Sequence, residues 1–456
     1  MKIISTNPYN NEIIGEVAKT TQEQAKVIIK TAKASFGAWR DLGLKKRIEI
    51  IADLYEHIKT NADKIARLIS LGMGKPITQA EGELSKGLAY IKWDLENAEK
   101  VLAPEITFEN EAEIHKIVYE PKGVVLAITP FNYPFSQWVW QTSQNLLVGN
   151  VVVNKPDINT PHVYKLLQEI IAKSKLPKGV QQFVFGGREM GQFLVEQDID
   201  MICFTGNTKT GEYLYKCAAE KMITISMELG GSAPGIICAD ADIDKIIGKV
   251  FDNRFSNCGQ VCCNVKRLIV HKSKYDLVVK KLAEMCSNLV FGNPLERTTT
   301  LGCLVNQSQL DVLMAQVNDA VKKGAKVICG GKKPKSLNGS FYEPTILTNI
   351  TPDMKVWTEE VFGPVLPIVQ FDTLEKAIEL ANDTIYGLGA FIYTHDSKTF
   401  ELLAQKMQSG MVAQNGLHFS CAWNPFGGTK RSGNSRVRGK HGFIELCNIK
   451  SIASEK

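Results

Sequence analysis

The stretch GVVLAITPFNYPFSQWVWQTSQNLLVGNVVVNKP, residues 123–156, decides the fold class of this chain. It contains two short runs of Val, Leu, Ile and Ala, at 124–129 and 151–154, that are almost entirely apolar. Such runs are typical of strands in a parallel sheet with both faces covered. A helical spacing of apolar residues follows at 163–171, so strand and helix alternate and predict βαβ units.

The same alternation extends in both directions from this stretch. Helical spacing precedes it at 21–39 and 48–65. Further strands are predicted at 116–119, 182–185, 201–205, 223–227 and 235–238, and a second alternation from about 256 to 428 adds strands at 268–270, 326–329, 366–371 and 389–393. We therefore predict an α/β protein with two parallel-sheet domains. Because no long linker separates them, a site is expected in the cleft between them.

Composition narrows the class of protein. The chain has 456 residues, of which 44% are hydrophobic and 22% charged, and its net charge is only +6 with the charges scattered. This composition indicates a globular enzyme-sized chain, and it argues against a nucleic-acid or membrane partner. The N-terminus lacks the apolar core of a secretory signal, and the eleven Cys are dispersed. We therefore expect reduced thiols and a cytoplasmic location.

Three short motifs contain residues that are capable of catalysis. Cys262 follows Gly259-Gln260-Val261 at a turn, where it is either a nucleophile or a buried inert thiol. Glu228 lies between an apolar strand and two glycines. It is either a desolvated general base or an ordinary surface carboxylate. Asn132 lies between two prolines. Its amide either donates a hydrogen bond to a developing oxyanion or caps a helix or turn.

Two further motifs could bind a phosphate group. F-T-G-N-T-K-T-G at 204–211 follows a strand and opens a helix, whose N-terminus attracts anions. Lys155 ends the strand at 151–154, at the edge where doubly wound sheets bind ligands. No metal-ligand spacing is present in the sequence, so no metal is expected.

Taken together, the motifs resemble those of the aldehyde dehydrogenase superfamily over nearly the whole chain. Seven motifs occur in the order of that family: P-F-N-Y-P at 130–134, V-V-N-K-P at 152–156, F-T-G-x-T-x-x-G at 204–211, E-L-G-G at 228–231, G-Q-V-C at 259–262, E-E-V-F-G-P at 359–364 and N-P-F-G-G-T-K-R-S-G at 424–433.

The resemblance implies NAD(P)-dependent oxidation of an aldehyde to the acid, with NADP or NAD as cofactor. Cys262 would be the nucleophile, Asn132 and the Cys262 N–H would hold the oxyanion, and Glu228 would activate the hydrolytic water. The residues implied to bind the cofactor are Thr129, Pro130, Phe131, Lys155, Gly191, Thr205, Gly206, Asn207, Leu229, Glu360 and Phe362. Those implied to contact the substrate are Tyr133, Trp140, Val261, Cys263 and Ser420.

The resemblance also implies a domain plan. A cofactor-binding domain would comprise 1–103 and 122–230, a catalytic domain 231–431, and a small β oligomerisation arm 104–121 and 432–456. The arm implies a homodimer or homotetramer. A C-terminal strand near 444–452 would account for the apolar Phe443, Ile444, Leu446 and Ile449.

Two departures from the family pattern bear on specificity. Ile158 stands where NAD-preferring members often have Glu, so we expect NADP to be accepted at least as readily as NAD. Trp140 stands where relatives acting on succinic semialdehyde often have Arg, which favours an uncharged aliphatic, hydroxy or aromatic aldehyde. Succinic semialdehyde, with Arg431 as one candidate for its carboxylate, stays the alternative. More remote alternatives are a thiol esterase and a catalytically silent binding protein.

Overall fold

The structure is a computed structural model that describes residues 1–417 and 419–456. Its first sheet has the strand order β7-β6-β5-β8-β9, with every neighbouring pair parallel. The strands are β5 (Val124–Ile128), β6 (Val151–Lys155), β7 (Gln181–Phe183), β8 (Met201–Thr205) and β9 (Thr224–Glu228). All residues of β6 are buried, because helices cover the sheet.

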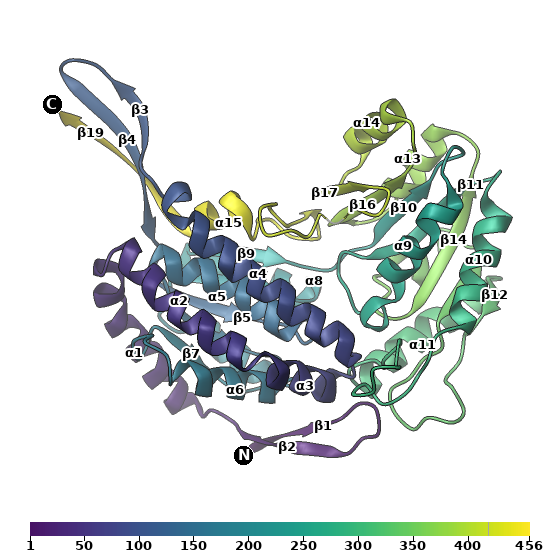
Figure 1. Ribbon diagram of the computed structural model, residues 1–456, viewed down its shortest axis with the longest axis horizontal. Helices are drawn as coiled ribbons and strands as arrows, with labels where there is room; N and C mark the ends of the chain where they lie inside the picture. The colour runs from purple at the N-terminus through teal and green to yellow at the C-terminus, as the bar shows by residue number, and fades with distance from the viewer. Residues whose placement is uncertain (418) are drawn as a thin grey trace.

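Helices from the N-terminal half pack around this sheet (Figure 1). They are α1 (Gln22–Asp41), α2 (Leu44–Thr60), α3 (Ala62–Met73), α4 (Ile77–Val101), α5 (Pro134–Val148), α6 (Pro161–Ile171), α7 (Arg188–Val195) and α8 (Thr208–Lys221). An antiparallel hairpin, β1 (Lys2–Thr6) and β2 (Ile13–Ala18), precedes them and was not predicted. Its strands are largely exposed, so they lack the apolar runs from which the other strands were predicted.

The second sheet has the order β12-β13-β14-β11-β10-β16-β17. Its strands are β10 (Ala233–Ile237), β11 (Val265–His271), β12 (Lys326–Cys329), β13 (Thr345–Thr348), β14 (Val365–Phe371), β16 (Gly389–Tyr393) and β17 (Met411–Gln414). Its helices are α9 (Ile243–Phe255), α10 (Tyr275–Ser287), α11 (Gln307–Lys322), α12 (Lys355–Thr358), α13 (Leu374–Asn382) and α14 (Ser397–Lys406). The edge strand β12 runs antiparallel to β13, and the other pairs are parallel. The α/β class with parallel sheets is therefore confirmed.

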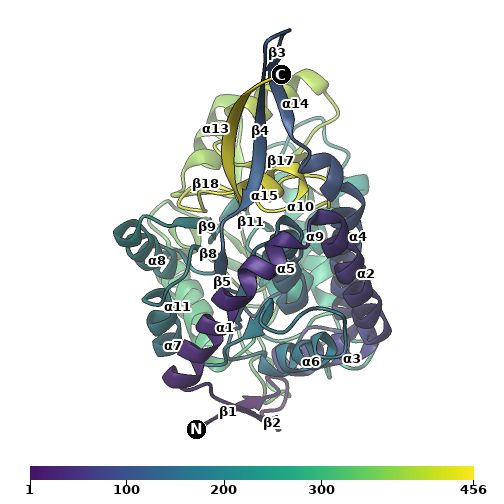
Figure 2. The same ribbon diagram turned by 90° about the vertical axis from the view of Figure 1, so that its left-hand side faces the viewer.

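Two small antiparallel sheets complete the fold. One pairs β15 (Tyr386–Gly387) with β18 (Thr429–Lys430). The other has the order β19-β4-β3, from β3 (Glu105–Glu109), β4 (Glu113–Pro121) and β19 (Cys447–Glu455), and it projects away from the body of the molecule (Figures 1 and 2). The domain boundaries given above stay predictions.

The C-terminal strand begins later than predicted. Residues Gly439–Glu445 form helix α15, and Phe443 on this helix is fully buried in the core of the first domain. Phe443 and Ile444 therefore belong to a helix, and the prediction of a strand from 444 was wrong at its start. Among the described helices, none is both long and apolar enough to cross a membrane.

Candidate active site

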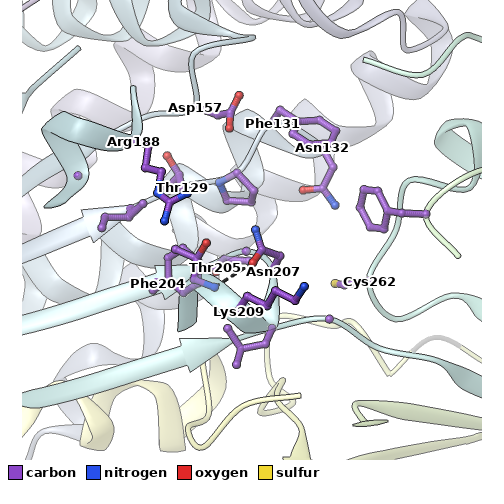
Figure 3. Close-up of a pocket in the computed structure, with 18 of the residues that line it drawn as sticks. Thr129, Phe131, Asn132, Asp157, Arg188, Phe204, Thr205, Asn207, Lys209 and Cys262 are labelled. Carbon is purple, nitrogen blue, oxygen red and sulfur yellow. Dashed lines mark hydrogen bonds between the residues drawn. The ribbon is translucent and has the colours of Figure 1, made fainter. Parts of the chain in front are cut away.

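A cavity of about 790 Å³ lies between the two sheets (Figure 3). Its walls come from the carboxyl ends of β5, β6 and β8, from α7 and α8, and from residues 262, 360 and 362 beyond the first sheet. This is the edge at which parallel sheets bind ligands. The cavity brings together these residues named from the sequence: Thr129, Pro130, Phe131, Asn132, Lys155, Gly191, Thr205, Gly206, Asn207, Leu229, Cys262, Glu360 and Phe362.

The N-terminus of α8 lines this cavity and suits a phosphate group. The Asn207 Oδ1 caps the helix by accepting from the Thr210 N–H at 2.9 Å. Gly206 precedes the cap, and a Cβ there would lie 2.4 Å from the Phe204 ring, so the backbone packs more closely than another residue allows. Lys209 also lines the cavity. Helix N–H groups and a lysine favour an anion at this point.

Lys155, at the end of β6, and Glu360, in the segment before β14, both line the cavity. Burial lowers the pKa of Lys155, while Asp157 opposes that shift. Glu360 forms an ion pair with buried Lys266 and accepts from the Gly231 N–H at 3.1 Å. These contacts hold the Glu360 carboxylate in one position, where it can accept hydrogen bonds from hydroxyl groups. The donors, the acceptors and the volume of the cavity thus fit a dinucleotide.

Cys262 follows a tightly wound turn. Asn257, Cys258 and Gly259 have φ of 52°, 54° and 70°. A Cβ at Gly259 would lie 2.2 Å from the Gly363 carbonyl oxygen, so only glycine fits there. The fully buried Gln260 holds the turn, because its amide donates to the Asn257 and Cys303 carbonyls, both at 3.2 Å.

Asn132 contacts this turn directly. Its Nδ2 donates to the Gln260 carbonyl at 3.0 Å, and its own carbonyl accepts from Lys75 Nζ at 2.9 Å. Lys75 in turn forms an ion pair with Glu83, which accepts from the Phe135 N–H at 2.9 Å at the start of α5. Sequence reasoning missed Lys75, in the loop between α3 and α4, and Glu83 on α4, since their only signal is a pair of opposite charges far from the motif.

The Cys262 thiol faces the cavity (Figure 3). A hydrogen bond with Cys263 and burial raise the pKa of Cys262, while the Lys266 ammonium opposes that shift. The resting sulfur is therefore protonated, and attack on a carbonyl requires removal of the proton.

Glu228 lies in a second, much smaller cavity of about 10 Å³, beside Trp140, Gln144 and Arg436. Phe204 and Thr205 line both cavities and so lie between Glu228 and the large one. Both carboxyl oxygens are buried and have no hydrogen-bond partner among the described residues. Burial raises the pKa of Glu228 well above that of a free glutamate, and Arg436 and Arg438 oppose the shift. The structure thus places Asn132 and Cys262 together in the large cavity. Glu228 lies in the small cavity, behind Phe204 and Thr205.

The predicted substrate residues lie outside the large cavity. Trp140 contacts Tyr90 and Phe426, with ring centroids at 6.1 and 5.1 Å. The Tyr90 hydroxyl lies 3.4 Å from Ser420 Oγ. Tyr133 lies within electrostatic range of Cys262, Cys263 and Tyr90, and Val261 lies in the turn between Gln260 and Cys262. These contacts indicate an aromatic face beside the sulfur atoms.

Trp138, two residues before Trp140 on α5, belongs to the core of the first domain. It is buried and packs against Phe135, with ring centroids 6.1 Å apart. Successive helical residues point in different directions, so Trp138 and Trp140 lie on different sides of α5. The side chain of Trp423, unlike that of Trp138, is largely exposed to solvent, at 63%.

Comparison with known proteins agrees with this geometry. Residues 1–452 match the family model described as Aldehyde dehydrogenase family. The chain is 34% identical to the mitochondrial succinate-semialdehyde dehydrogenase of Rattus norvegicus, over 98% of this chain and 86% of that protein. It is 33% identical to a probable succinate-semialdehyde dehydrogenase [NADP(+)] of Sinorhizobium fredii, over 98% and 91%.

This chain is also similar to a solved structure over its whole length. The NAD⁺ complex of an aldehyde dehydrogenase from Bacillus cereus superposes with a TM-score of 0.96 at 31% identity, covering 100% of this chain and 93% of that one. With the family model matched over nearly all residues, this chain belongs to the aldehyde dehydrogenase family, and its activity is the NAD(P)-dependent oxidation of an aldehyde.

Proposed function

We propose that Cys262 is the nucleophile of this oxidation. Its thiolate attacks the aldehyde carbonyl carbon, and the resulting oxyanion accepts hydrogen bonds from the Asn132 amide and the Cys262 N–H. The observation that supports this is the shared position of Cys262 and Asn132 in one cavity, joined through Gln260. Lys266 favours the thiolate electrostatically.

Glu228 is the proposed base for thioester hydrolysis. A carboxylate with a raised pKa takes up a proton readily near neutral pH, as this role requires. To reach a water beside Cys262, the side chain must turn out of its small cavity, past Thr205. Glu228→Gln should therefore retain the first turnover of hydride transfer and slow steady-state turnover by about 10²- to 10⁴-fold. A burst followed by almost no turnover at 340 nm supports this role, whereas unchanged steady-state turnover contradicts it.

The large cavity is the proposed cofactor site. Lys155 and Glu360 would bind ribose hydroxyls, and the α8 N-terminus with Gly206 and Asn207 would bind the diphosphate. NAD(P) bound there would supply the hydride acceptor that the conversion of an aldehyde adduct to a thioester needs. The Phe362 and Phe131 rings, with centroids 6.1 Å apart, line the same cavity as Cys262.

We further propose that NADP is used at least as readily as NAD. Ile158 and Asp157 lie in the cavity wall with Arg188, a cation that the sequence did not single out. The Asp157 Oδ1 already accepts from the Asn159 N–H at 2.9 Å. A 2′-phosphate near Arg188 therefore meets a cation, with an apolar residue at 158. A kcat/KM for NADP more than ~100-fold below that for NAD contradicts this proposal, and Ile158→Glu should reduce NADP use far more than NAD use.

The central test is formation of reduced cofactor at 340 nm from butanal with either cofactor. Cys262→Ala should abolish it, while Cys329→Ala, a substitution of the thiol on β12, serves as the matched control and should retain it. Retained activity in Cys262→Ala would place the nucleophile elsewhere. A thiol esterase or a silent binding protein would give no signal with aldehyde and cofactor, so the same assay separates those alternatives.

We also propose assembly into a homodimer or homotetramer through the arm. The strands β3 and β19 form its two edges, and Ile106, Phe108 and Ile449 on them are exposed. Unpaired strand edges with apolar side chains favour pairing with another copy. Light scattering of the purified protein should give two or four times the chain mass, and a monomer would refute this.

The proposed location is cytoplasmic. The free cysteines support this proposal, and cell fractionation tests it.

A further inference from the structure

Arg438, immediately before α15, is a cation buried among aromatic rings. It is only 3% exposed and has a φ of 68°, so its backbone is held in a conformation that few non-glycine residues adopt. Its guanidinium carbon lies 4.6 Å from the Trp140 ring centroid, 4.8 Å from that of Phe426 and 5.0 Å from that of Tyr90. The predicted substrate residue Trp140 therefore packs directly against a buried cation.

The guanidinium of Arg438 is incompletely hydrogen-bonded. Its Nη1 donates to the Cys421 carbonyl at 3.1 Å. Its Nε and Nη2 are buried and have no partner in the part of the chain that the structure describes. In the other deeply buried arginines each guanidinium nitrogen donates at least one hydrogen bond; these are Arg47, Arg254 and Arg267.

The two unpaired groups are the ones that bind a carboxylate side-on. Nε–H and Nη2–H of an arginine point in the same direction and match the two oxygens of a carboxylate. Leaving such donors buried without an acceptor is costly, so their retention points to a ligand.

The location of Arg438 brings these donors near Cys263, the residue after Cys262, and near Glu228. Arg438 interacts electrostatically with Cys263 and Glu228. The Tyr90 ring beneath it is hydrogen-bonded through its hydroxyl to Ser420. Three other cations of this region already have carboxylate partners: Lys75 with Glu83, Lys266 with Glu360 and Arg431 with Glu212.

We propose that Arg438 binds the carboxylate of an aldehyde substrate that carries this group at the end opposite the carbonyl. The inference rests on the proposed function and specifies its substrate class. The rings of Tyr90, Trp140 and Phe426 shield the pair from water, which strengthens it. Trp140 by itself favoured an uncharged aldehyde, but beneath Arg438 it is part of an anion-binding pocket. Arg438 is accordingly a substrate-binding residue.

The first test compares two aldehydes of equal carbon number, succinate semialdehyde and butanal, at saturating NADP. The wild type should have a kcat/KM at least ~100-fold higher for the semialdehyde. Arg438→Met should lose about that factor, chiefly through KM, while butanal oxidation falls less than tenfold. Arg438→Lys, which keeps the charge but not the planar pair of donors, should fall in between. Arg431→Met, the matched control at the alternative cation, should keep the wild-type preference.

The second test needs no turnover. Succinate should protect Cys262 of the wild type from alkylation by iodoacetamide at concentrations where butyrate does not, and this difference should disappear in Arg438→Lys even if Arg438→Met fails to fold. Equal protection by the two acids, or a wild type without preference for the semialdehyde, overturns the proposal. If butanal is oxidised in that case, the proposed function still stands. If neither aldehyde reduces the cofactor, the proposed function itself fails.

Discussion

The buried ion pair between Lys75 and Glu83 offers a quantitative test of how the site is held in place. Both side chains are 0% exposed. Lys75 donates to the Asn132 carbonyl at 2.9 Å and lies 3.7 Å from the Tyr133 ring centroid. Burial lowers the pKa of Lys75, and Glu83 opposes that shift, so each charge depends on the other. The perturbation is Lys75→Met, alone and combined with Glu83→Gln.

Removing only the cation leaves a buried carboxylate without its partner, which costs about 3–5 kcal/mol. The double substitution removes both charges, and the amide oxygen introduced by Glu83→Gln can still accept from the Phe135 and Ser136 N–H groups that the carboxylate now holds at 2.9 and 3.1 Å. We therefore expect the double variant to lose only about 1–2 kcal/mol, the contribution of the hydrogen bond to Asn132. Because Asn132 loses its anchor in both variants, kcat should fall in both.

The assay is urea unfolding followed by tryptophan fluorescence at one fixed protein concentration, with kcat measured alongside. Lys46→Met is the matched control, because its ion pair with Glu49 is exposed and should contribute less than about 1 kcal/mol. A Lys75→Met variant as stable as Lys46→Met would refute the reasoning. So would a double variant less stable than Lys75→Met, since the charges would then not be coupled.

Three further predictions concern single residues. Asn132→Ala should lower steady-state kcat by about 10²- to 10³-fold, as for one lost oxyanion donor, and a loss below threefold contradicts that role. Gly259→Ala should abolish activity because its Cβ would meet the Gly363 carbonyl at 2.2 Å, whereas Gly324→Ala, which is strained at φ 99° without a contact, should stay active. Burial raises the pKa of Asp94 to about 7, so its protonated form stabilises the fold and this contribution falls as pH rises from about 4 to 7. The stability gain of Asp94→Asn should therefore increase by about 4 kcal/mol over that range, and a pH-independent gain in urea unfolding contradicts it.

Local sequence was sufficient for the elements that carry the site. The apolar runs at 124–129 and 151–154 predicted β5 and β6, because a strand buried on both faces is apolar at most of its positions. The motif order also identified the residues of the cavity, including Asn132 and Cys262. The β1–β2 hairpin escaped prediction because only alternate residues such as Ile3 and Val17 are buried, so its strands carry no continuous apolar run.

Tertiary structure alone decided which of these residues meet and how they are charged. The sequence singled out Glu228 as a candidate general base. In the structure, its carboxyl group lies behind Phe204 and Thr205 rather than in the large cavity. Arg438 contacts Trp140 across nearly 300 positions of sequence, and its unpaired donors exist only because the fold buries them. Periodicity reflects contacts within one helix or sheet. The cost of a buried charge depends on every group packed around it, and those groups come from distant parts of the chain.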